Sequence, residues 1–419
     1  MCKIAIAGGG ASGMFAAVLL AEKGYKPVIY EKNDRLGKKL FITGKGRCNL
    51  TNDCLVEELF DNVVSNPKFL YSAFYGFDAD KTMDFFKKLG LAVKTERGGR
   101  VFPVSDHSSD VIGVLSTRLK RLGVEIHLGT EVVALTWDTE NQDKKITGIT
   151  IKRADGKEEW QAFSRVVVAT GGLSYPLTGS TGDGLRWGSA LGLEITEPRP
   201  ALVPMNIRED MCGGLMGLSL RNVGLNYVAE VKGKDKTVYS DMGEMLFTHF
   251  GVSGPVVLRA SSYLGRYVDS NLRLYLDFKP ALSDEQLDGR LLRDFSGNMN
   301  KQFRNSLGDL LPKRMIPYVI ERSGIDPYQK VNVISRAERQ NLIRTIKHFE
   351  LHVESFRGFD EAIITQGGIK VKEINPGTME AKHVNGLFFI GEVLDVDALT
   401  GGYNLQIAWS TAAACADGL

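Results

Sequence analysis

The sequence has few cysteines and prolines and no long apolar run, and each shortage excludes a class of protein. Five cysteines at irregular spacings, without a C-x-x-C pair, indicate neither a disulfide framework nor a zinc ribbon. Thirteen prolines in 419 residues exclude a low-complexity chain. No apolar run reaches the roughly 18 residues that a membrane span needs. We therefore expect a cytoplasmic protein of a reducing compartment, without a membrane partner.

The sequence also lacks an excess of either charge. Lys and Arg number 52, Asp and Glu 50, and the net charge is +2, so the composition shows no overall footprint of nucleic-acid binding. The cations Lys301, Arg304, Lys313 and Arg314 are accompanied by acidic residues and are interpreted as a solvated surface. We expect a small-molecule substrate and no nucleic-acid partner, and the composition leaves the oligomeric state open.

Glycine, by contrast, is abundant, with 46 residues. The segment Gly8–Gly13 matches G-x-G-x-x-G between an expected strand at 3–7 and an expected helix at 11–23. In such a turn the glycines permit the tight bend, the approach of a pyrophosphate and close helix–strand packing. Glu31 ends the next expected strand, at 27–31, where a carboxylate can bind the ribose hydroxyls of an adenosine. The context predicts a dinucleotide site, and a purely structural turn is the alternative.

The hydrophobic pattern beyond this opening predicts an α/β fold with a parallel sheet. Further strands are expected at 124–127, in an antiparallel meander at 131–162, and at 166–168 and 387–390. After about Pro198 the sequence pattern predicts mainly strands, and further along it predicts mainly helices.

We therefore predict a discontinuous nucleotide-binding domain with an insert. Residues 1–195 plus 345–419 form the domain, 196–282 a β-rich insert and 283–344 a helical insert.

Three later features favour FAD over NAD. The apolar strand at 166–168 runs into small residues, as required where a chain passes close to a dinucleotide. The segment 387–392 is a second apolar strand that ends in glycine and an acid. The segment 401–406 opens the last expected helix, whose free amides can hold the pyrimidine end of a flavin. An ordinary strand and an ordinary helix cap are the alternatives for the last two.

Several segments together resemble a bacterial family of FAD-dependent oxidoreductases. They are the first glycine turn, Gly37–Asn52, Gly243–Pro255, Gly391–Asp395 and Gly401–Gln406. Members are described as aminoacetone oxidase-like or as reductases of 3-dehydro bile acids, and the similarity covers essentially the whole chain. The resemblance implies a two-dinucleotide-binding-type FAD domain, with a parallel sheet and a β-meander, and an inserted β-barrel-like and helical domain.

The expected FAD contacts lie at the glycine turns, at the strand ends and in the basic segment 37–52. They are Gly8, Gly10, Ala11, Ser12, Gly13, Glu31, Lys32, Lys38, Arg47, Cys48, Asn49, Val133, Thr170, Gly171, Gly172, Gly391, Glu392, Asp395, Gly402, Tyr403, Asn404, Leu405 and Gln406. Within 37–52 we favour Arg47 and Asn49, because a guanidinium and an amide suit phosphate and flavin edges. A solvated basic loop is the alternative.

Candidate catalytic residues are His249, Tyr175 and Cys48. His249 and Tyr175 are possible proton donors, and Cys48 is a possible thiol beside the flavin. A structural histidine and an inert packed thiol are the alternatives. His348 and His352 have helical i, i+4 spacing but no accompanying acid, so we expect no metal site.

The resulting expectation is an FAD-dependent oxidoreductase that moves a hydride between a small organic substrate and flavin N5. We favour an NAD(P)H-linked reductase of an unsaturated or carbonyl compound. Residues 200–386 hold no second glycine fingerprint, so NADH or NADPH is expected to visit the flavin only transiently as a co-substrate. An oxygen-using amine oxidase that releases hydrogen peroxide is one alternative. A non-catalytic flavin-binding redox sensor or an RNA-associated flavoprotein is the other.

Overall fold

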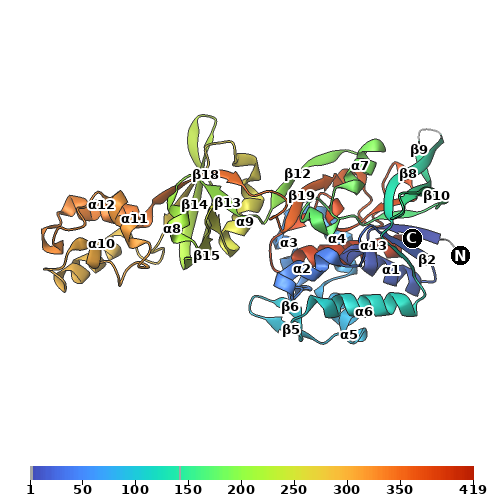
Figure 1. Ribbon diagram of the computed structural model, residues 1–419, viewed down its shortest axis with the longest axis horizontal. Helices are drawn as coiled ribbons and strands as arrows, with labels where there is room; N and C mark the ends of the chain where they lie inside the picture. Colours follow the sequence, from blue (N-terminus) through green and yellow to red (C-terminus); the bar gives the residue numbers. More distant parts are fainter. Residues whose placement is uncertain (1–2, 141–142) are drawn as a thin grey trace. The chain divides into compact units, whose positions relative to one another are not determined.

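The computed structural model describes residues 3–140 and 143–419, which divide into two compact units (Figure 1). The first unit ends at Ala201 and resumes at Phe359, and the second is Leu202–Gly358. The domain limits predicted from the sequence, 195 and 345, lie 6 and 14 residues before these limits.

Strand pairing explains where the boundaries lie. Strand β12 (Ile195–Ala201) pairs with β19 (Ile364–Ile369), which keeps both in the first unit. Strand β18 (Phe349–Phe356), predicted in the first domain, pairs with strands of the second unit. A local pattern cannot show which distant strand a segment pairs with, and this pairing sets the boundary.

A five-stranded parallel sheet lies at the centre of the first unit, in the order β21–β11–β1–β2–β7. Its strands are β1 (Lys3–Ala7), β2 (Lys26–Glu31), β7 (Glu125–Leu128), β11 (Val166–Val168) and β21 (Leu387–Phe389). The three strands in the middle of this order are almost entirely buried, as in a sheet that is covered on both faces. The predicted parallel sheet is confirmed.

The predicted meander is also present. It consists of β8 (Glu131–Glu140), β9 (Asp143–Lys152) and β10 (Glu158–Ala162), which pair antiparallel in sequence order. Strand β20 (Val384–Asn385) adds to β9 in parallel.

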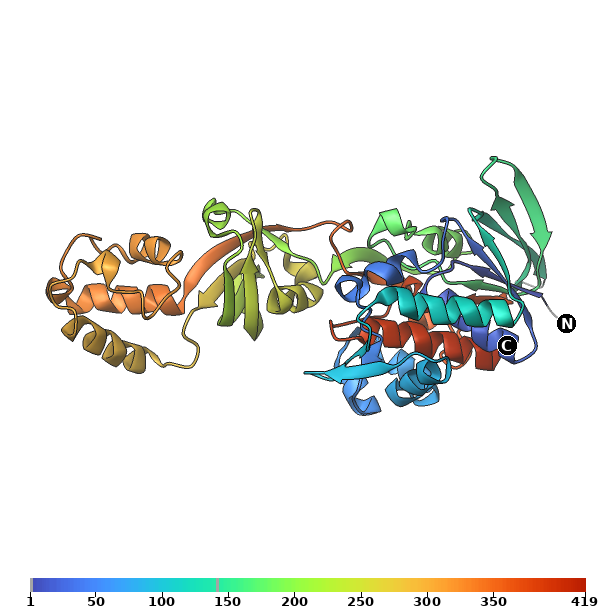
Figure 2. The same cartoon turned by 60° about the horizontal axis from the view of Figure 1, so that its bottom comes forward.

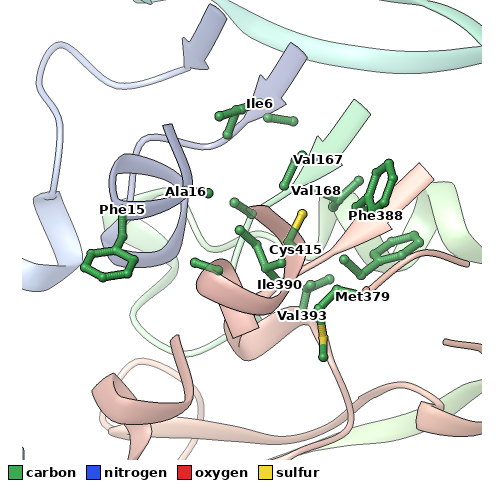
Figure 3. Packing of buried hydrophobic residues seen from close by; sticks show 14 of the residues in the cluster. Ile6, Phe15, Ala16, Val167, Val168, Met379, Phe388, Ile390, Val393 and Cys415 are labelled. Carbon is green, nitrogen blue, oxygen red and sulfur yellow. The ribbon is translucent and has the colours of Figure 1, made fainter. Parts of the chain in front are cut away.

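Helix α1 (Ala11–Glu22) follows the first glycine turn and packs against two other helices. They are α6 (Ser108–Arg121) and α13 (Tyr403–Gly418), and Figure 2 shows them close beside α1. Small residues on α13 allow this close packing, and Trp409 and Cys415 of that helix are fully buried. Figure 3 shows side chains of α1, α13 and the sheet meeting in one core.

The segment between β2 and α6 forms short elements, of which the sequence pattern predicted the amphipathic helix at 80–89 and left the others unresolved. They are α2 (Lys38–Gly46), β3 (Thr51–Asn52), α3 (Val56–Asp61), β4 (Val63–Ser65), α4 (Tyr71–Gly76), α5 (Ala79–Lys88), β5 (Val93–Glu96) and β6 (Arg100–Pro103). Strands β3, β6 and β5 form a small sheet, and β4 pairs with β22 (Asp397–Ala398). Helix α7 (Asp183–Ala190) follows β11.

The second unit contains a closed barrel in the order β13–β16–β15–β14–β17–β18. Its remaining strands are β13 (Met205–Ile207), β14 (Ser219–Val231), β15 (Lys234–Phe247), β16 (Gly251–Ser253) and β17 (Arg273–Asp277). Its helices are α8 (Met211–Leu215), α9 (Pro255–Leu264), α10 (Asp284–Ser296), α11 (Ile316–Ser323) and α12 (Arg336–Lys347). The expected β-barrel-like and helical insert is confirmed, and both parts share one hydrophobic core.

Capping explains two of the helix starts in the helical part, α10–α12. Ser283 accepts from the Gln286 backbone N–H, and Ser335 accepts from the Glu338 backbone N–H, each within a capping box. Among the described residues, none of the helices has the length and apolar character needed to cross a bilayer.

Candidate functional site

The three motif glycines of the first turn have different surroundings. Gly8 has a φ of +108°, and a Cβ there would lie 2.4 Å from the carbonyl oxygen of Ala169. A Cβ on Gly13 would lie 2.0 Å from the carbonyl oxygen of Gly8. Gly10, the N-cap of α1, has no side-chain cap, and no other part of the described chain comes within 4 Å of its Cβ position. Open space therefore lies before a helix N-terminus whose amides can receive a pyrophosphate.

The adenosine side of this turn is formed by Glu31 and the meander. The Glu31 carboxylate is buried, and its Oε2 accepts from the Gly9 N–H at 2.7 Å. Its Oε1 accepts from the backbone N–H and the side chain of Asn33 at 2.9 and 2.7 Å. Val133 lies at a register shift between β8 and β9, and its carbonyl accepts from Trp187 Nε1 at 3.3 Å. Glu31 is thus held at the turn, where a ribose-binding carboxylate is expected.

The carboxyl ends of β11 and β21 lie beside the same turn. Gly391 has a φ of +72°, and a Cβ there would lie 2.8 Å from Oγ of Ser12. Its N–H donates to Oγ1 of Thr411 on α13 at 3.0 Å. A Cβ on Gly172 would lie 2.4 Å from Oγ1 of Thr365. The starts of α1 and of the segment after β21 therefore meet, although they are almost 380 residues apart in the chain.

The N-terminus of α13 lies against β3. Gly402 has a φ of +104°, and a Cβ there would lie 2.3 Å from the carbonyl oxygen of Thr51. Burial raises the pKa of Tyr403 to about 12, so its phenol stays protonated at neutral pH. The contact brings the expected pyrimidine-binding helix end next to the segment 37–52.

Two side chains of the segment 401–406 bind within the protein. Asn404 accepts from the Ala398 N–H at 2.9 Å and donates to the Ala398 carbonyl at 2.7 Å. Gln406 is fully buried and accepts from the hydroxyls of Thr51 and Thr82 at 2.6 and 2.9 Å. Its amide donates to the Phe77 carbonyl at 2.9 Å. The side chains of Asn404 and Gln406 are thus held by protein partners, and the contact of the backbone amides of 401–406 with a flavin stays a prediction.

The basic residues are also more engaged than expected. Lys32 lies 2.6 Å from Asp183, and Arg47 lies 2.5 Å from both Glu96 and Asp106. The Arg47 guanidinium stacks over the Phe102 ring, 4.0 Å from its centroid. Lys38 donates to Asn33 Oδ1 at 3.1 Å. Two carboxylates thus hold the Arg47 guanidinium, and its contact with a diphosphate stays a prediction.

Asn49 behaves differently. Its Oδ1 is buried and has no hydrogen-bond donor within the described part of the chain. A buried polar oxygen without a partner is costly, and a donor on a bound ligand would satisfy it. Asn49 therefore remains a candidate for a flavin edge.

Cys48 does not suit a reactive thiol. It is fully buried in the core of the first unit, and burial raises the pKa of its thiol to about 12. The pKa of Cys54 is likewise raised to about 12 by burial. Both thiols stay protonated near neutrality, so the expectation of a catalytic Cys48 is corrected.

The other two catalytic candidates lie in different units. Tyr175 is half-buried with a φ of +52°, and burial together with Glu361 raises the pKa of its phenol. A tyrosine in this left-handed conformation is uncommon and is held here by its N–H bond to the Phe359 carbonyl. His249 is exposed in the second unit, with its ring edge-on to Phe250 at 5.0 Å. Both residues stay predictions.

Sequence reasoning missed the partners of Glu392. Its carboxylate lies 2.6 Å from Lys39 Nζ, and it accepts from the hydroxyl of Ser174 at 2.7 Å and from the Thr365 N–H at 2.8 Å. These residues join α2, the segment after β11, β19 and the segment after β21. Glu392 thus ties together the elements around the site, and an acid after a strand-ending glycine was the only local signal for it.

Asp397 is a second group that the sequence did not single out. It is 1% exposed, and burial raises the pKa of its carboxyl to about 6. Gln366 Nε2 donates to it at 3.2 Å, and the carboxylates of Asp395 and Glu392 add a smaller upward shift. Asp395 itself accepts from the Thr196 hydroxyl at 2.6 Å. A buried carboxyl that titrates near neutrality is a candidate proton-holding group.

The remaining expected cofactor contacts stay predictions. They are Ala11, Thr170, Gly171 and Leu405. Of these, Thr170 donates from its hydroxyl to the Gly171 carbonyl at 3.5 Å. Within the described residues, no group of three or more His, Cys, Asp and Glu side chains is arranged to hold a metal.

Comparison with known proteins gives this geometry its context. The HI0933-like protein Rossmann domain family matches residues 2–418. The chain belongs to this family. A relative named 3-dehydro-bile acid delta(4,6)-reductase, from Clostridium scindens, is 32% identical over 98% of this chain and 97% of its own. A ribosomal RNA dihydrouridine synthase from Escherichia coli is 30% identical over 99% of this chain and 97% of its own. A protein of the same name from Haemophilus influenzae is 30% identical over 98% and 96%.

A solved structure supports the fold of this HI0933-like chain. It is that of 3-ketosteroid delta1-dehydrogenase from Sterolibacterium denitrificans, with a TM-score of 0.53, 13% identity, and coverage of 100% of this chain and 99% of the other. At this identity the likeness shows the fold alone. The family match and the full-length relatives, named as a reductase and as dihydrouridine synthases, make this protein an FAD-dependent oxidoreductase.

The residues of the first unit fit FAD. Gly10 leaves room for the pyrophosphate, Glu31 is placed for the ribose, and Asn49 Oδ1 is a buried acceptor that lacks a donor. FAD bound here supplies a two-electron carrier that accepts and donates a hydride.

Proposed function

We propose that this protein is an NAD(P)H-linked reductase of a carbon–carbon double bond conjugated to a carbonyl group. One observation carries the proposal. Full-length relatives are named for two unrelated substrates, a bile acid and ribosomal RNA, and both names imply reduction of the same type of double bond. A 3-oxo steroid with double bonds at positions 4 and 6 and the uracil base of uridine both contain an alkene conjugated to a carbonyl. The conjugated carbonyl makes the alkene an acceptor for a hydride.

The reaction balances with a nicotinamide cofactor as the reductant. The double bond gains a hydride on one carbon and a proton on the other, while NAD(P)H is oxidised to NAD(P)⁺. The chain has one fingerprint of the G-x-G-x-x-G type after a strand, at Gly8–Gly13, which we assign to FAD. NADH or NADPH therefore acts in this proposal as a transient co-substrate, without a domain of its own.

The protein's task is then to bind, to exclude water and to hold a proton. Burial keeps the phenol of Tyr175 protonated, and the buried carboxyl of Asp397 is partly protonated below neutral pH. We assign these two groups as the proton-holding candidates of the first unit. Glu392 positions the surrounding segments through its contacts with Lys39 and Thr365.

Anaerobic spectroscopy tests the proposal. The purified yellow protein should bleach on addition of NADH or NADPH, and its colour should return when a conjugated enone or a uridine-containing RNA is added without oxygen. A saturated ketone serves as the matched control and should leave the bleached spectrum unchanged. Bleaching by an amine alone, with hydrogen peroxide formed in air, would instead establish the amine oxidase.

Uracil within RNA is a second candidate for the substrate. Two full-length relatives are named for ribosomal RNA, and the charge is unevenly distributed over this chain. Residues 202–358 contain 22 Lys and Arg against 18 Asp and Glu, while the remainder contains 30 against 32. The excess lies within 283–347, which contains 12 cations and 8 acids.

A further inference from the structure

A cationic and aromatic surface lies in the helical part of the second unit, on two segments that the fold brings together. Residues 301–304 and 327–331 run side by side and antiparallel. The Phe303 N–H donates to the Gln329 carbonyl at 2.9 Å, and the Val331 N–H donates to the Lys301 carbonyl at 3.1 Å. The Phe303 side chain is fully buried, which anchors the pair of segments on the core.

The side chains that leave this pair of segments are exposed cations and one aromatic ring. Lys301, Arg304 and Lys330 are exposed, and the Tyr328 ring is 60% exposed. The Arg304 guanidinium lies 4.5 Å from the centroid of the Tyr328 ring, and its Nε donates to Gln302 at 3.1 Å. No ion pair holds Lys301 or Lys330 within the described ranges. We call these four residues the 301/328 surface.

An exposed tyrosine ring held beside an arginine, with two lysines nearby, matches the chemistry of a nucleic-acid strand. Lysines neutralise phosphates, while an aromatic ring and a guanidinium plane stack on unpaired bases. Apolar side chains nearby in the sequence are exposed too, Met299 at 57% and Val333 at 63%.

We propose that the 301/328 surface binds a single-stranded segment of RNA, with Tyr328 stacked on a base and the three cations on phosphates. This deepens the proposed function by making uracil in RNA the reduced group, and it rests on that function for the reaction. The proposal differs from the sequence expectation of a solvated face with no nucleic-acid partner, because the pairing of 301–304 with 327–331 brings together cations that the net charge conceals.

Fluorescence anisotropy of the full-length holoprotein with a labelled RNA hairpin carrying a uridine-rich loop tests the inference. The triple variant Lys301→Gln, Arg304→Gln, Lys330→Gln should bind at least about tenfold more weakly. Its slope of log affinity against log salt should be smaller by roughly 2, as three lost phosphate contacts predict. The matched control Lys26→Gln, Lys120→Gln, Lys152→Gln removes the same charge from exposed lysines of the first unit and should bind like wild type.

Tyr328 tests the stacking separately. Tyr328→Ala should weaken RNA binding roughly tenfold, whereas Tyr328→Phe should restore it, since a phenyl ring also stacks. Flavin absorbance and thermal unfolding confirm that each variant is folded. Equal losses of RNA affinity in both triple variants would indicate diffuse charge binding and overturn the inference. An unchanged RNA affinity in Tyr328→Ala, together with equally strong competition by polyglutamate, would overturn it in favour of an acidic protein partner.

The two proposals fail in different ways. Wild type that reduces a small enone with NAD(P)H but binds no RNA would sink this inference and leave the proposed function standing. Surface-dependent RNA binding without reduction of any conjugated double bond would retain this inference and sink the proposed function.

Discussion

At the scale of single residues, two glycines of the first turn are required for different reasons, one for the fold and the other for the expected ligand. Gly13 has no room for a side chain because the turn itself fills the space. Gly10 has room in the protein but lies where the pyrophosphate of FAD is expected. The two positions therefore offer a matched pair of alanine variants.

Gly13→Ala should lower the free energy of unfolding of the apoprotein by about 1–3 kcal/mol, since a Cβ 2.0 Å from a carbonyl oxygen forces a shift. Gly10→Ala should cost no more than about 1 kcal/mol, as at an N-cap, yet weaken FAD binding roughly tenfold or more. Denaturant unfolding and FAD titration measure the two effects. Equal loss of stability in both variants would contradict the distinction.

Asp397 gives a prediction about pH. Its carboxyl pKa is raised from 3.8 to about 6, so the folded state binds more protons than the unfolded state between these values. The stability contributed by this group is present at low pH and is lost as pH rises from about 4 through 6, by up to about 3 kcal/mol.

Asp397→Asn should remove that loss. The stability of the variant relative to wild type should rise over this window and then stay level to pH 8, as followed by denaturant unfolding. Asp417→Asn, at an exposed position, is the control for a lost charge. A difference that stays constant with pH would mean that Asp397 does not titrate there.

At the scale of elements, α13 is attached to the segment 37–88 by a buried polar network rather than by apolar packing alone. Gln406 connects β3, through Thr51, with α5, through Thr82. Ser410 donates to the Phe77 carbonyl in the same region. Because these groups are buried, each one that loses its partner is costly.

Gln406→Ala should lower the free energy of unfolding by about 2–5 kcal/mol. The Thr51 hydroxyl loses its acceptor, and the Thr82 hydroxyl and the Phe77 carbonyl each lose one hydrogen bond. Asp417→Ala, in the same helix, loses only an exposed ion pair with Lys23 and should cost less than about 1 kcal/mol. Chemical denaturation of both variants without FAD compares them. If Gln406→Ala lowers the free energy of unfolding by no more than Asp417→Ala does, water has replaced the amide.

At the scale of the whole molecule, the described residues form two hydrophobic cores, one in each unit. The expected FAD contacts lie in the first unit, so bound FAD stabilises that unit by mass action. Separate cores imply separate cooperative unfolding.

Calorimetry should therefore resolve two unfolding transitions, and FAD should raise the midpoint temperature of only one of them. Leu276→Ala, at a fully buried barrel position, should lower the other transition, as a core truncation that costs about 2–5 kcal/mol does. It should leave the affinity for FAD unchanged. A single transition that moves with both FAD and Leu276→Ala would show that the units unfold as one.

Local sequence patterns were sufficient to predict much of the fold of the first unit. The glycine turn, Glu31 and the parallel strands were predictable, because hydrophobic periodicity and turn residues report on neighbours in the chain. The partners of Arg47, Asn404 and Gln406 were not predictable, since Asp106, Ala398 and Thr51 come close only after folding.

By itself, the sequence determined a flavoprotein-type α/β domain with an insert and the place of its nucleotide turn. Only the tertiary structure decided that Asp397 is buried, that β18 closes the barrel, and that 301–304 lies beside 327–331. The reason is physical: burial, pKa and pairing depend on which distant segments exclude water from one another.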